Sequence, residues 1–196
     1  MTKSIFLLPA LIFSVITSSA QAFKVNITYT TKPASLTGSS YIFYSPGEKL
    51  AIGDFQADPE SNSRAVAITS SGFAFSAGFR GNEDEAVLNI DVYCNFNKSK
   101  SWMKEKGKNK YILGHEQLHF DISYLTTMRF IQKLKQAKFT TSNYNQVVQK
   151  IYRESVNELQ AKQDQYDSET MNGQLEDKQL AWMEKVGKEL ESIAIR

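Results

Sequence analysis

The chain has 196 residues, a formal net charge of +2 and a hydrophobic fraction of 41%. This length fits one domain with one sizeable core, and the near-neutral charge gives no reason to expect a nucleic-acid partner. Cys94 is the single cysteine, so an intrachain disulfide is excluded.

The N-terminal segment, residues 1–22, has the features of a secretory signal peptide. Lys3 supplies a positive charge, residues 5–16 form an apolar run, and Ala20-Gln21-Ala22 is an A-x-A cleavage site. The run is too short for a comfortable transmembrane span, although a retained signal anchor is the alternative. We therefore expect cleavage after Ala22, a mature chain that starts at Phe23, periplasmic or secreted localisation, and no stable membrane insertion afterwards.

The chain before about residue 100 alternates between apolar and polar side chains. This two-residue period is clearest over residues 23–29, 73–79 and 88–96, and it is typical of half-buried strands. Cys94 falls on the apolar side of the last run, where it fits as a small core residue. We expect residues 23–98 to form an N-terminal antiparallel β region.

From residue 108 onwards the apolar period becomes helical. Apolar stripes over residues 111–135, 147–166 and 180–193 predict about three helices, separated by pattern-breaking residues at 140–143 and 171–173. Strands followed by helices predict an α+β fold with a C-terminal helical bundle, in a single domain over residues 23–196.

The only two histidines bracket a glutamate in the segment His115-Glu116-Gln117-Leu118-His119. This is HExxH, the zinc-metalloprotease signature. On a helix, residues four apart share a face, so both imidazoles can reach one ion. Glu116 points off that axis, where it can polarise a water instead of binding the metal. The motif predicts zinc held by His115 and His119, with Glu116 as the catalytic base; a surface helix with two solvated histidines is the alternative.

Several further stretches accompany this motif. They are Asp54-Phe55, Ala67-Ile68-Thr69-Ser70-Ser71-Gly72, Lys100-Ser101-Trp102, the extended core His115-Glu116-Gln117-Leu118-His119-Phe120-Asp121-Ile122, Tyr166-Asp167-Ser168-Glu169-Thr170, and Gln179 with Trp182. In these stretches the chain resembles the bacterial predicted secreted zinc-dependent proteases, a family catalogued as a domain of unknown function with an HEQxHFD core motif. One position departs from the family pattern: Asn172, followed by Gly173, stands where the family usually has a histidine.

A catalytic zinc usually has three protein ligands and a water. No third histidine exists and Cys94 lies in a predicted strand, so an oxygen ligand is needed. The downstream carboxylates are Glu158, Asp164, Asp167 and Glu169. The chain resembles proteases that use HExxH plus an aspartate on a following helix, which implies Asp167; the alternatives are Glu169, the Asn172 amide oxygen, or Asp167 as a helix-end or outer-sphere carboxylate. Asp121 lies two residues past His119 and is expected to point away from the metal, into a supporting hydrogen bond.

The resemblance implies a secreted or periplasmic zinc-dependent metallopeptidase that acts on a peptide or protein substrate. Asn172 motivates the alternative of a catalytically degenerate metal- or peptide-binding envelope protein, and a metal hydrolase that does not cleave peptides is the third possibility. Tyr166 is a candidate oxyanion donor or a packing residue. Trp102 and Trp182 are expected in the core rather than on a substrate platform.

Overall fold

The structure is a computed structural model that describes residues 22–194 apart from positions 35, 37, 39 and 82–84. The expected signal peptide therefore lies outside the described residues, except for Ala22. Among the described residues six strands come first: β1 (Ala22–Tyr29), β2 (Tyr41–Phe43), β3 (Ala67–Ile68), β4 (Ser71–Gly81), β5 (Glu85–Asn97) and β6 (Trp102–Met103). Three long helices follow: α1 (Lys110–Gln136), α2 (Tyr144–Thr170) and α3 (Glu176–Ala194). The predicted α+β fold class is confirmed.

The main sheet is built around β5. β4 pairs antiparallel along one edge of β5, while the other edge is shared by β1, which is parallel, and β2, which is antiparallel. The sheet is therefore mixed, which corrects the expectation of an antiparallel region. Alternation of apolar and polar residues shows that one face of a strand is buried, but it is the same for either strand direction, so it could not reveal the parallel β1.

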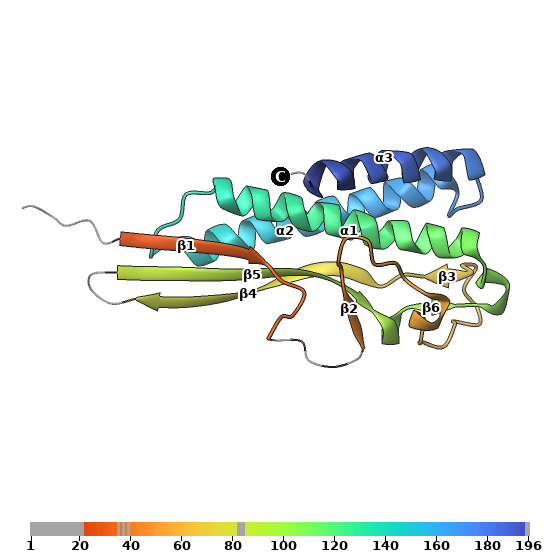
Figure 1. The fold of residues 1–196 in the computed structure, drawn as a ribbon, viewed down its shortest axis with the longest axis horizontal. Helices are drawn as coiled ribbons and strands as arrows, with labels where there is room; N and C mark the ends of the chain where they lie inside the picture. The colour runs from red at the N-terminus through yellow and green to blue at the C-terminus, as the bar shows by residue number, and fades with distance from the viewer. Residues whose placement is uncertain (1–21, 35, 37, 39, 82–84, 195–196) are drawn as a thin grey trace, which may run out of the picture.

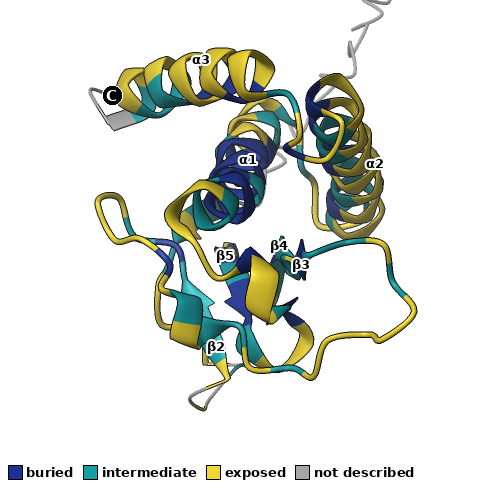
Figure 2. Ribbon diagram, turned by 90° about the vertical axis from the view of Figure 1, so that its right-hand side faces the viewer, coloured by how far each residue is buried: buried dark blue, intermediate teal, exposed yellow. Residues whose placement is uncertain are grey.

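All three helices lie on one side of the main sheet, with α1 next to the strands and α2 and α3 flanking it (Figures 1 and 2). The sheet contributes Leu88, Ile90 and Val92 to the core, and α1 contributes the helical stripe of Leu118, Ile122 and Leu125; all six side chains are buried. A second apolar cluster, which contains Cys94, Phe96 and Phe120, continues the core towards β2. The helix that carries HExxH is thus held on several sides.

Helix boundaries follow local chemistry. The Asn109 side chain caps α1 by accepting a hydrogen bond from the Ile112 amide at 3.0 Å. The C-terminal end of α2 is set by Met171, Asn172 and Gly173, which all have a positive backbone φ. There the backbone amide of Asn172 donates to the Asp167 carbonyl at 2.7 Å. This sharp stop leads the chain directly into α3.

A small second sheet pairs β3 with β6, with Ile68 opposite Trp102. It lies beside the N-terminal half of α1, where the Thr69 hydroxyl donates to the Glu116 carbonyl at 3.2 Å. Trp102 is buried, as expected for a core residue. Within the described residues, no helix is both long and apolar enough to cross a membrane.

Candidate metal centre

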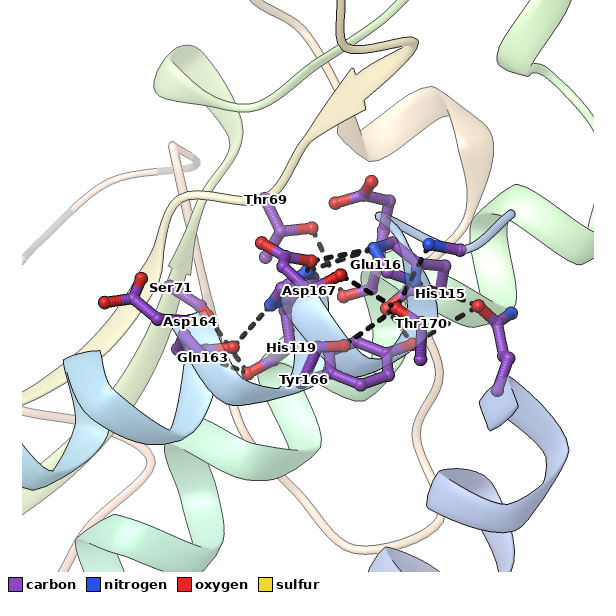
Figure 3. A network of polar contacts seen from close by, with 12 residues as sticks. Thr69, Ser71, His115, Glu116, His119, Gln163, Asp164, Tyr166, Asp167 and Thr170 are labelled. Carbon is purple, nitrogen blue, oxygen red and sulfur yellow. Dashed lines mark hydrogen bonds and ion pairs between the residues drawn. The ribbon is translucent and has the colours of Figure 1, made fainter. Parts of the chain in front are cut away.

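Three potential metal-binding atoms converge where α1 packs against the end of α2. The Nε2 atoms of His115 and His119 lie 3.3 Å apart, and they lie 3.2 and 3.1 Å, respectively, from Oδ1 of Asp167. Figure 3 shows the Asp167 carboxylate reaching both imidazoles. The predicted histidine pair therefore shares one helical face, and of the candidate carboxylates it is Asp167 that meets it.

The other candidate carboxylates have different partners. Glu158 pairs with Lys133, Asp164 accepts a hydrogen bond from Gln160, and Glu169 accepts one from the indole of Trp182 at 2.8 Å. Asp121 accepts hydrogen bonds from Tyr44 and Gln117 at 2.9 and 2.8 Å, away from the two imidazoles. The expectation that Asp121 makes a supporting hydrogen bond is confirmed.

Two glutamines contact the other nitrogens of the imidazoles. Nδ1 of His115 lies 2.9 Å from Oε1 of Gln179, and Nδ1 of His119 is in close contact with Oε1 of Gln163. The amide nitrogens of the same glutamines donate to the carbonyls of Tyr111 and His119, respectively, which fixes which end of each amide faces the ring. Because an amide oxygen can only accept, these contacts are hydrogen bonds in the tautomer that carries the proton on Nδ1 and leaves a lone pair on Nε2.

In that tautomer, three acceptor atoms face each other without a donor. Oδ1 of Asp167 is buried and has no hydrogen-bond partner among the described residues, although 37% of the Asp167 side chain is exposed. In a tetrahedral zinc site, where each ligand atom lies about 2.0–2.1 Å from the metal, any two ligand atoms are about 3.3–3.4 Å apart. The observed separations of 3.1–3.3 Å fit such a site. Two imidazole nitrogens favour zinc and its first-row neighbours over magnesium or calcium.

A proton is the competing cation at this position. Burial opposes protonation of His119, but a proton on its Nε2 would be donated to Asp167 and attracted by the charges of Glu116 and Asp167. These effects outweigh burial and raise the pKa of His119 above its ordinary value. Burial likewise opposes ionisation of Asp167, but the two histidines hold the pKa of its carboxyl well below its usual range. Asp167 is therefore ionised and available to a cation at neutral pH.

The ring of Tyr166 packs against both imidazoles. Its ring stacks on His115 at a centroid distance of 4.7 Å and meets His119 edge-on at 5.0 Å. The side chain is fully buried, and its hydroxyl lies 3.4 Å from Oε1 of Gln179. These contacts favour packing over the alternative of an oxyanion donor. Trp182 packs against Tyr166 and is also buried, as expected for a core residue.

The site opens into a cleft of about 770 Å³ between the segment 64–71, α1 and the end of α2. Glu116 lines this cleft beside the two histidines, although the residue is almost wholly buried. Asn172 lines it as well, at a backbone φ of 53°. Asparagine and histidine are both among the residues that tolerate this conformation, so the backbone at position 172 suits either residue.

Residues 98–174 match the model of a family described as a bacterial protein of unknown function (DUF922). The match covers less than half of the chain, but it includes His115, Glu116, His119, Asp167 and Asn172. No curated protein and no solved structure matches the chain significantly. The family description names no activity, so the resemblance to zinc-dependent proteases stays an expectation.

Sequence reasoning missed Gln163. It lies four residues before Asp167, so helical periodicity places both on one face of α2. However, Gln160 and Gln165 lie nearby on the same helix, and no sequence signal separated Gln163 from them. Gln179 was noted only as part of the resemblance, without a role.

Proposed function

We propose that the protein is a secreted or periplasmic zinc-dependent peptidase. The observation that carries the proposal is the convergence of the histidine Nε2 atoms and Asp167 Oδ1, spaced 3.1–3.3 Å apart with no donor between them. His115, His119 and Asp167 would hold the metal. Zinc bound there would lower the pKa of a coordinated water to about 7 and polarise the scissile carbonyl.

Glu116 has the position of a general base. The residue is only 4% exposed, yet it lines the cleft beside the two histidines. It is one residue from His115 along α1, so it points towards the cleft rather than between the imidazoles. Glu116 would take the proton of the attacking water and pass it to the leaving amine.

The cleft has dimensions that suit a peptide. Its volume of about 770 Å³ lies within the range of about 300–1,000 Å³ that ligand sites occupy. One wall is the extended segment 64–71, which includes β3, and extended segments bind peptides through backbone hydrogen bonds. A substrate strand laid along this wall would pass over Glu116. The signal-like N-terminus would place the enzyme and its peptide or protein substrates outside the cytoplasm.

The decisive experiment compares wild-type protein with Glu116→Gln, both loaded with zinc. The amide keeps the shape of the side chain and removes its basicity, so the variant should retain one zinc per chain and lose turnover by at least 10²–10⁴-fold. Metal content and the melting temperature serve as internal controls. Zinc-loaded wild-type protein that cleaves nothing in a broad peptide library would refute the peptidase proposal.

Asn172 favours one alternative, a catalytically degenerate envelope protein that binds metal or peptides. The chain resembles a family with a histidine at this position, and Asn172 lines the cleft beside the candidate ligands. The alternative predicts zinc and peptide binding without turnover. A metal hydrolase of other substrates would be recognised by activity on non-peptide esters or amides that Glu116→Gln abolishes.

A further inference from the structure

We propose that Gln163 and Gln179 are positioning residues that set both imidazoles in the Nδ1–H tautomer before any metal arrives. Each amide is held at both ends: the oxygen faces an imidazole Nδ1, and the nitrogen donates to a backbone carbonyl. Neither amide can turn without losing both contacts. The inference extends the proposed metal site, but its main readout is independent of metal and of activity.

Gln163 contacts both the ring and the backbone of His119. Its amide oxygen faces Nδ1 of the ring, while its amide nitrogen donates 2.9 Å to the carbonyl of the same histidine and 3.3 Å to the Ser123 hydroxyl. Ring and backbone of His119 are thereby tied to one side chain of α2. The rotation of the ring and the position of its Nε2 follow from this attachment.

Gln179 links α3 to the site in the same way. Its amide oxygen is 2.9 Å from Nδ1 of His115, its amide nitrogen donates to the Tyr111 carbonyl, and its side chain is only 1% exposed. The residue lies beyond the segment 98–174 that matches the family model. The candidate metal centre therefore depends on α3, which lies outside the matched segment.

The choice of glutamine has a chemical consequence. Histidine ligands commonly donate their second nitrogen to a carboxylate or a backbone carbonyl, and a carboxylate raises the basicity of the ligand. A neutral amide orients the ring without adding negative charge. Zinc held by two such imidazoles and one carboxylate would keep a net positive charge at the site, which favours polarisation of a carbonyl over tight retention of the metal.

The chain has only two histidines, which makes the test direct. ¹⁵N-labelled imidazoles of metal-free protein at pH 8 should give two spin systems, both protonated at Nδ1. In Gln163→Leu, His119 should lose this tautomer while His115 keeps it, and zinc affinity should fall about 10–100-fold. Gln163→Glu should keep the Nδ1–H tautomer of His119, because the carboxylate is still an acceptor for Nδ1. Gln165→Leu, on the exposed side of the same helix, is the matched control.

Two results would overturn the proposal. One is an Nε2–H tautomer for both histidines in metal-free wild-type protein. The other is a Gln163→Leu protein whose His119 tautomer and zinc affinity both equal those of the Gln165→Leu control. The corresponding change at the other ring, Gln179→Leu, should act on His115 alone, which separates orientation of a ring from a general loosening of the fold.

A second inference rests on a different observation, the uneven charge of the cleft. Arg64 and Lys106 both line it, both are exposed, and neither forms an ion pair among the described residues. They belong to two chain segments that meet where the Lys104 backbone amide donates to the Val66 carbonyl at 2.8 Å. Lys106 precedes α1, so this pair marks the end of the cleft where α1 begins.

Asp164 also lines the cleft, beside the Gln163 that contacts His119, and thus farther along α1 than Lys106. The geometry points to a substrate that places a carboxylate at the Arg64–Lys106 end, either an acidic side chain or a free C-terminus. This inference deepens the proposed function and depends on it.

Four short peptide hydroxamates test this inference against zinc-loaded protein: glutamate or glutamine beside the metal-binding group, each with a free or an amidated C-terminus. Two exposed ion pairs should make the preferred carboxylate form bind about 2–30-fold tighter than its neutral counterpart. Comparing the glutamate arm with the free C-terminus arm shows which source is recognised. Arg64→Gln with Lys106→Gln should remove the preference, and Arg153→Gln, outside the cleft, should not.

Outcomes of this test are distinguishable. Equal binding of all four hydroxamates overturns the carboxylate inference and leaves the zinc peptidase proposal standing. Failure of every hydroxamate to bind zinc-loaded protein overturns both.

Discussion

Gly173 lies close to the imidazole of His115, and replacing it with alanine should damage the site in a measurable way. A Cβ at this position would lie 3.0 Å from Nδ1 of His115 and 3.2 Å from Oε1 of Gln179. Both atoms belong to the hydrogen bond that orients the ring, so neither can move freely. The backbone φ of +78° adds strain for any residue with a side chain.

The magnitude follows from two contributions. A left-handed backbone costs a non-glycine residue about 1–2 kcal/mol, and overpacking in a well-filled region costs about 1–3 kcal/mol more. Gly173→Ala should therefore lower the free energy of unfolding by about 2–5 kcal/mol, or the melting temperature by about 4–20 °C at this chain length. Displacement of His115 should also weaken zinc binding by at least about 10–100-fold, the effect of losing an outer partner.

Two other glycines separate these contributions. Gly47 has a φ of +90° and open space around its Cβ position, so Gly47→Ala should show the backbone cost of about 1–2 kcal/mol and no change in zinc affinity. Gly187 lies in α3 with nothing near its Cβ position, and Gly187→Ala should stabilise the protein by about 0.5–1 kcal/mol. Calorimetry and chelator competition supply both measurements. The reasoning is refuted if Gly173→Ala matches Gly47→Ala in stability and leaves zinc affinity intact.

Four further predictions concern the ligands, the cleft, pH and export. Asp167→Ala should weaken zinc binding by much more than the roughly 100-fold of an outer partner, whereas Glu169→Ala should leave it unchanged because that carboxylate accepts from Trp182; equal losses would mean that Asp167 is not a ligand. Asn172→His should raise turnover by up to roughly 10²–10³-fold if a donor at this position stabilises an oxyanion, and should instead tighten zinc binding if the position supplies a ligand; kinetics at saturating zinc with a parallel metal titration decides between them. Zinc affinity should fall as the pH is lowered, and because the pKa of His119 is raised, proton competition should begin above the ordinary histidine value of about 6.5; an NMR titration of metal-free protein with the His119 midpoint below that value would contradict the raised pKa. N-terminal sequencing of protein from the envelope or medium should begin at Phe23, and recovery of intact chain in the membrane would favour a signal anchor.

Local periodicity was sufficient to predict the pair of histidines on one helical face. An α-helix fixes the relation of residues i and i+4 without any knowledge of the rest of the chain, and His115 and His119 lie as that geometry requires. The strands of the main sheet and the three helices followed from the same kind of pattern. What periodicity could not give was strand direction, because β1 buries the same alternate residues in either orientation.

The third member of the site depends on how two helices pack, which lies beyond local pattern. Asp164, Asp167 and Glu169 are similar carboxylates within six residues, and only the rotation of α2 against α1 selects Asp167. The resemblance to HExxH-plus-aspartate proteases implied the same residue. Gln163 carried no such signal, because its role appears only when its amide is seen between a ring nitrogen and a carbonyl.

The parallel pairing of β1 with β5 has consequences for the order of folding. Phe23 lies beside Ala86 in this pairing, so the first strand of the sheet must wait for a partner that follows β2, β3 and β4 in the chain. β4 and β5, and likewise α1 and α2, are neighbours in the chain and close much shorter loops. β1 is therefore expected to join last. Until it does, the β5 edge over residues 85–92 is open to strands of other molecules, which makes this step the slowest and the most sensitive to protein concentration.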